Sequence, residues 1–95
     1  MKVFKARPGV VLLEVCGEHI LVATGEAREK CPNVFHINDR GAKLWELILA
    51  EQVPGKIVKR AQEELALPPA DALRSCLVFF SKLTDAGYLL QEDIP

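Results

Sequence analysis

The sequence contains no apolar run approaching the roughly 20 residues needed to cross a bilayer. It also has no C-x-x-C pair, and its three cysteines (Cys16, Cys31 and Cys76) are odd in number and widely spaced. This favours a reducing compartment over a disulfide framework, and buried or half-buried apolar cysteines over zinc or iron–sulfur ligands. The segment MKVFKARPGV lacks the apolar core of a signal peptide. We therefore expect a cytoplasmic protein with no membrane partner.

An excess of either charge is missing as well. Twelve Lys and Arg residues against 13 Asp and Glu leave a net charge of −1, so we expect no nonspecific attraction to nucleic acid or anionic lipid. The chain contains no G-x-S-x-G, glycine-rich phosphate loop or HExxH. The acidic pairs Glu63-Glu64 and Glu92-Asp93 are interpreted as solvated surface charge. The sequence thus predicts a chain that is not an enzyme and uses no cofactor or metal.

What is present is enough apolar surface for one packed domain spanning residues 1–95, since 49% of the residues are hydrophobic. The aliphatic runs Val10–Val15 and His19–Thr24 flank a short turn at Cys16-Gly17-Glu18. Runs of this length and composition, separated by turn residues, are typical of a β-hairpin. The polar segment Gly25–Pro32 is predicted to be a loop.

A third strand is predicted for "NVFHI", residues 33–37. Its alternation places Phe35 and Ile37 on one face, and Val34 and His36 on the other. We expect His36 to lie on a half-exposed sheet face and not to act as a catalytic base. Asn38 should end this strand and cap a helix at about 39–51 without an intervening loop, because its side chain accepts a backbone N–H of the first turn.

Two further helices follow. Pro54 suits the first position of the second helix, since its missing N–H costs nothing there, and Leu67-Pro68-Pro69 ends it. The third helix should run from Pro69 to about Ala86, with Gly87 as a left-handed C-cap and an extended tail after it. The predicted fold is α+β, a three-stranded antiparallel sheet followed by three helices (β-β-β-α-α-α). The second and third helices resemble a winged helix-turn-helix.

The third helix carries an apolar arc of roughly 160°, wider than the stripe of about 100° that a surface helix needs. Its members are Ala72, Leu73, Cys76, Leu77, Phe79, Phe80 and Leu83. Two interpretations remain open, a helix wedged between neighbours and a helix that lines an apolar groove for a partner. The strand at 33–37 has no lysine, glutamate or internal proline, so its edge is open to an added peptide strand.

Four segments in order resemble PqqD-like proteins, the peptide-binding domains also called RiPP recognition elements. They are "PGVVLLEVCGEHILV", "FHINDRGAKLWELI", "KIVKRAQEEL" and "VFFSKLTDAGYLL". The resemblance covers about Arg7 to Leu90, and "INDRGAKLWELI" is its most specific part. It implies a winged-helix-like fold and a non-catalytic peptide chaperone. Such a protein binds the leader segment of a ribosomally made precursor peptide and presents it to a modifying enzyme, such as a radical SAM enzyme in pyrroloquinoline quinone synthesis.

The resemblance also implies a binding mode, in which the leader adds as a strand against the third strand, beside the third helix. Phe79 and Leu83 match family positions that look like core. The positions that the resemblance implies for peptide binding are Val34, Phe35, His36 and Ile37, mainly through backbone, and Leu73, Leu77 and Phe80 on the helix. The oligomeric state expected is a monomer or a weak homodimer.

The alternative hypothesis is a winged-helix regulator that binds DNA. A recognition helix needs Arg, Lys, Asn or Gln directed at the major groove. The positions of the third helix that we expect to be exposed are Asp71, Arg74, Ser75, Ser81, Lys82 and Asp85. Their charges cancel, which favours the peptide-binding interpretation.

Overall fold

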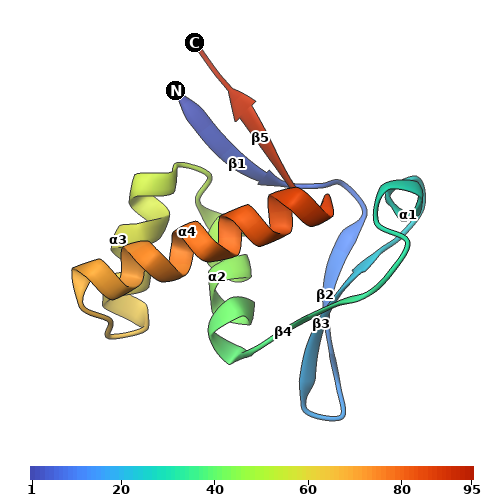
Figure 1. Ribbon diagram of the computed structural model, residues 1–95, viewed down its shortest axis with the longest axis horizontal. Helices are drawn as coiled ribbons and strands as arrows, with labels where there is room; N and C mark the ends of the chain where they lie inside the picture. Colours follow the sequence, from blue (N-terminus) through green and yellow to red (C-terminus); the bar gives the residue numbers. More distant parts are fainter.

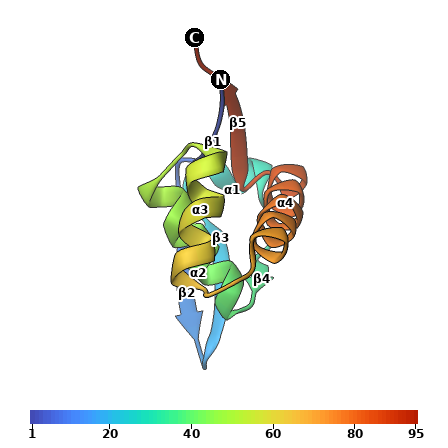
Figure 2. The same ribbon diagram turned by 90° about the vertical axis from the view of Figure 1, so that its left-hand side faces the viewer.

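The computed structural model describes residues 1–95, and its fold is the predicted α+β arrangement (Figure 1). One antiparallel sheet has the strand order β2-β3-β4, and three helices follow it along the chain. The bounds of these elements are β2 Val10–Val15, β3 Glu18–Ala23, β4 Phe35–Ile37, α2 Asp39–Ala50, α3 Pro54–Glu64 and α4 Pro69–Ala86. The β2–β3 hairpin and the two chain ends extend from opposite ends of the helical layer (Figure 2).

The hairpin turns through two residues. Val15 pairs with Glu18, and both Cys16 (φ 51°) and Gly17 (φ 80°) have left-handed backbones. Positive φ at both central positions is the type I′ geometry, whose twist matches that of the flanking strands. Cys16 is therefore exposed at the tip of the hairpin, and its expected burial is wrong. Cys31 and Cys76 are buried as expected.

The segment predicted as a polar loop contains a one-turn helix, α1 (Ala27–Lys30). Ala27 and Cys31 are buried in the main core, while the charged residues between them are exposed. A four-residue helix is too short to leave a periodic apolar pattern, which is why the sequence shows no sign of it.

Strand β4 is shorter than predicted, with three paired residues in place of five. The backbone carbonyl of Asn33 accepts a hydrogen bond from the Tyr88 hydroxyl, so it is used outside the sheet. Val34 lies before the paired segment and is 51% exposed. The expected alternation holds within β4, because Phe35 and Ile37 are half-buried and His36 is exposed.

A second sheet, absent from the prediction, joins the two ends of the chain. Strand β1 (Lys2–Ala6) pairs antiparallel with β5 (Leu89–Asp93), in a register that places Ala6 opposite Leu89. Phe4 of this sheet stacks on Phe80 of α4 with ring centroids 4.4 Å apart. Gly87 ends α4 in the left-handed conformation expected of it, at φ 91°.

The core lies between the three-stranded sheet and the helices. Its largest fully buried side chains include Trp45 of α2, Leu21 of β3, Ile57 of α3 and Leu83 of α4. The burial of Leu83 agrees with its expected place in the core. No helix combines the length and the apolar character that crossing a membrane requires.

Candidate functional site

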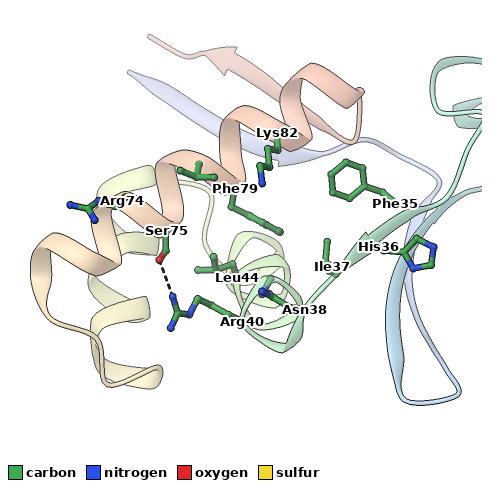
Figure 3. A pocket seen from close by; sticks show the side chains of 12 residues that line it. Phe35, His36, Ile37, Asn38, Arg40, Leu44, Arg74, Ser75, Phe79 and Lys82 are labelled. Atoms are coloured by element: carbon green, nitrogen blue, oxygen red, sulfur yellow. Dashed lines mark hydrogen bonds between the residues drawn. The ribbon is translucent and has the colours of Figure 1, made fainter.

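A surface groove of about 370 Å³ lies between β4, the start of α2 and one side of α4 (Figure 3). Polar and charged side chains line its margins, and apolar side chains form its floor. The apolar lining residues are Phe35, Ile37, Leu44, Val78 and Phe79. Two segments that are distant in the chain, 35–44 and 74–82, therefore build one site.

The direct connection from β4 to α2 through Asn38 forms one wall of this groove. Asn38 has an extended backbone, and its side-chain Oδ1 accepts a hydrogen bond from the Gly41 amide at 2.8 Å. This cap satisfies an N–H of the first helical turn, so only Asn38 separates the end of β4 from the start of α2. The absence of a loop keeps the edge strand and the N-terminus of α2 side by side.

Gly41 brings the opposite wall close. A Cβ added there would lie 3.1 Å from the Ile37 Cβ and 3.2 Å from Cε1 of the Phe79 ring. The missing side chain thus leaves room for the Phe79 ring against the first turn of α2. In Figure 3 this ring points from α4 toward α2 and β4.

The outer edge of β4 has no strand beside it. The C-terminal segment of the chain pairs with β1, so it leaves this edge open. In the short connection before β4, the Asn33 carbonyl accepts a hydrogen bond from the hydroxyl of Tyr88, which lies between α4 and β5 in the chain. The edge and the groove together form an open slot beside α4.

The strand register shows which backbone groups face this slot. In a two-residue hairpin the residues next to the turn exchange hydrogen bonds, and the bonded pairs then alternate. The Thr24 amide donates to the Gly9 carbonyl at 2.8 Å, in agreement with even-numbered β3 residues bonding toward β2. The backbone N–H and C=O groups of His19 and Leu21 consequently face β4.

His19 pairs with Ile37, and Leu21 pairs with Phe35. Phe35 and Ile37 therefore direct their backbone N–H and C=O groups into the sheet. His36, the residue between them, directs its N–H and C=O outward along the open edge. One outward donor and one outward acceptor thus lie beside the apolar groove.

The structure brings together only part of the residue set implied by the resemblance. Phe35, His36 and Ile37 line the groove, whereas Val34, Leu73, Leu77 and Phe80 do not. Leu73 and Leu77 are exposed, and they border a second hollow along α4 that adjoins the groove at Arg74 and Val78. Val34 is displaced from the groove because it precedes the ladder.

Phe80 and Phe79 exchange their expected places. Phe80 is only 3% exposed and packs against Phe4, so it belongs to the core. Phe79, expected in the core, is half-buried and forms part of the groove floor. The reason is that the β1–β5 sheet covers the Phe80 side of α4. The alternating segment Lys2–Ala6 was the available signal for that sheet.

The groups with shifted pKa values lie outside the groove. Hydrogen bonding from Lys43 lowers the pKa of the Glu64 carboxyl, and burial raises the pKa values of the Cys76 thiol and the Tyr88 phenol. No cluster of three His, Cys, Asp or Glu side chains suited to a metal ion occurs in the chain. The groove combines backbone groups and apolar surface, an arrangement suited to holding an extended chain.

The fold and the groove define an α+β winged-helix-like domain with an open sheet edge beside its longest helix. The chain belongs to the PqqD family, since the sequence model of Coenzyme PQQ synthesis protein D (PqqD) matches residues 10–89. A search of the curated proteins finds no match.

Among solved structures, the chain is similar to one described as lasso peptide synthetase B1 complexed with the leader peptide. The TM-score is 0.71 at 20% sequence identity, and the alignment covers 92% of this chain and 96% of that chain. At this level of identity the likeness establishes the fold.

Proposed function

We propose that this protein is a non-catalytic peptide chaperone. It binds the leader segment of a ribosomally made precursor peptide by strand addition to β4 and presents it to a modifying enzyme, such as a radical SAM enzyme. The PqqD family membership and the leader peptide bound to the lasso synthetase B1 relative support this role.

The observation that carries the proposal is the outward-facing backbone of His36 next to the apolar groove. An added strand would pair its own amide and carbonyl with His36 and would place alternate side chains against Phe79 and Ile37. Main-chain hydrogen bonds then give affinity, and the pockets for alternate side chains give selectivity. His36 takes part through its backbone, so its imidazole is dispensable for binding.

Proline at position 36 tests this mode. The probes are fluorescein-labelled peptides selected on the wild-type protein from a randomised library of 12-residue peptides, and binding is measured by fluorescence anisotropy. His36→Pro removes the outward N–H and leaves the β3–β4 ladder intact. We expect about tenfold weaker binding, equivalent to about 1.4 kcal/mol. His36→Ala should stay near wild-type affinity.

Two further measurements keep the result interpretable. Circular dichroism checks that His36→Pro is folded. Phe35→Pro serves as the comparison, because it removes a backbone hydrogen bond to Leu21 and should therefore detach β4 from β3. In addition, N-methylation of each peptide amide in turn should weaken binding at alternate positions. Equal affinity of folded His36→Pro and His36→Ala, with no alternation in the methylation series, would rule out strand addition.

A further inference from the structure

All the charged side chains at the margins of the groove are cationic. The charged side chains that line it are those of Arg40, Arg74 and Lys82, and no carboxylate is among the lining residues. This differs from the chain as a whole, whose net charge is −1. The positive charge is therefore concentrated locally and is not a property of the average surface.

These three cations have no carboxylate partner within salt-bridge distance, whereas Lys43 and Arg60 both pair with Glu64. The acidic residues nearest to Arg40 and Lys82 along the chain have other surroundings. Asp39 contacts His19, at 2.9 Å, and Asp85 borders the hollow on the Phe80 side of α4. The groove cations are thus available to a ligand.

Arg40 is held in place over the groove. Its Nη1 donates to the Ser75 Oγ at 3.3 Å, which links the start of α2 to α4 (Figure 3). A single hydroxyl contact leaves most of the guanidinium donors free, and these donors suit a carboxylate. Lys82 lies farther along α4 toward Phe35, and the floor residue Phe79 lies between Ser75 and Lys82 in sequence.

The spacing of the cations matches an extended peptide. Ser75, which Arg40 contacts, and Lys82 are seven residues apart on α4, about 10 Å along the helix axis. Residues i and i+4 of a strand lie about 13 Å apart on the same face, with i+2 between them. The long Arg and Lys side chains accommodate the difference in length.

From these features we infer that the groove selects an acidic peptide segment with the pattern acidic–x–bulky apolar–x–acidic. The apolar side chain lies on Phe79, and the two carboxylates meet Arg40 and Lys82, with Arg74 adding positive charge at the outer margin. This inference rests on the proposed strand addition and specifies the chemistry of its substrate. Binding should weaken as the salt concentration rises, since both ion pairs are accessible to solvent.

A library selection tests the pattern. Peptides of 12 residues with five randomised central positions are selected in parallel on the wild-type protein, on His36→Pro and on the double variant Arg40→Gln/Lys82→Gln. Sequences that depend on His36 should carry Asp or Glu four positions apart around an apolar residue. The double variant should lose this enrichment and bind the best acidic peptide about five- to tenfold more weakly.

The matched control is Lys56→Gln/Lys59→Gln, which removes two exposed charges from α3 outside the groove. It should keep both the enrichment and the affinity. Edge-dependent peptides without acidic enrichment, or equal loss in the control variant, would overturn the inference while leaving strand addition standing. A selection that yields no peptide sensitive to His36→Pro would instead contradict the proposed function itself.

Discussion

At the scale of single residues, Phe79 and Phe80 show how one helical position changes the role of a side chain. The two are adjacent, so their side chains leave α4 about 100° apart. Phe80 contacts Phe4 and is almost fully buried, whereas Phe79 faces the groove beside Ile37 and Gly41. The first ring therefore stabilises the fold, and the second forms the floor of the candidate site.

Alanine at each position should separate these roles. Phe80→Ala should lower the free energy of unfolding by about 3–5 kcal/mol, because it removes a buried ring and leaves a cavity. Phe79→Ala should cost less, since that ring is already half-exposed, but it should weaken the binding of selected peptides more strongly than any other α4 substitution. Urea denaturation and fluorescence anisotropy measure the two effects. Equal destabilisation by both variants would contradict this assignment.

At the scale of secondary-structure elements, the β2–β3 hairpin and strand β4 are held in the sheet in different ways. The β2–β3 hairpin is closed by a two-residue turn, in which Cys16 adopts a left-handed backbone conformation that residues other than Gly, Asn and Asp seldom adopt. Strand β4, in contrast, is held to the sheet by only three residue pairs and continues directly into α2. A short strand anchored by a capped helix supports an open edge without a long exposed ladder.

The hairpin turn yields a prediction of its own. Cys16→Asn should raise the free energy of unfolding by up to about 1 kcal/mol, because Asn tolerates the left-handed backbone that costs most L-residues about 1–2 kcal/mol. Cys16→Val should lower it, since a β-branched side chain disfavours positive φ. Thermal and urea denaturation of both variants in reducing buffer measure the difference. If Asn and Val changed stability equally, backbone strain at Cys16 would be excluded as the cause.

At the scale of the whole molecule, the pairing of the two chain ends determines which side of α4 remains accessible. Strands β1 and β5 cover the Phe80 side, and the Arg7 guanidinium donates to the Gly87 carbonyl where α4 ends. The C-terminal strand β5 therefore pairs with β1 and does not cover the edge of β4. The same packing buries Tyr88, whose hydroxyl donates to the Asn33 carbonyl, and so ties β5 to the segment before β4.

This packing predicts a loss of stability at alkaline pH. Burial raises the pKa of the Cys76 thiol above its ordinary 9.0, and burial together with Cys31 raises the pKa of the Tyr88 phenol above its ordinary 10.0. Both groups hold their protons more tightly when folded. Their contributions are therefore complete below pH 9 and decrease as the pH rises beyond it, because the unfolded chain ionises first.

Urea denaturation between pH 7.5 and 10.5 measures this effect. The decrease in the free energy of unfolding above pH 9 should become shallower in Cys76→Ala and in Tyr88→Phe, whatever their stability at pH 7.5. Cys16→Ser, which changes the exposed thiol, should keep the wild-type slope. An unchanged slope in both buried-group variants would contradict the assignment.

Local sequence signals were sufficient for the order of β2, β3, β4, α2, α3 and α4, but not for α1 or the β1–β5 sheet. The hydrophobic periods predict β2, β3, α2, α3 and α4, and the capping residues Asn38 and Gly87 predict where α2 starts and where α4 ends. Each of these signals depends on contacts within a few residues, so it can be read from the chain alone. The apolar arc of α4, in contrast, left open whether this helix is wedged between neighbours or lines a groove for a partner.

Only the tertiary structure decided the site. Which margin of α4 faces the groove depends on the pairing of β1 with β5, about ninety residues apart in the chain. The alternation of Lys2–Ala6 indicates a strand, but no local pattern identifies its partner. The outward direction of the His36 amide depends on the register of β3 with both its neighbours. The cationic margins likewise arise because Arg40 of α2 and Lys82 of α4 line the same groove. Local propensities place residues on elements, whereas long-range packing places one element against another, and a groove exists only between elements.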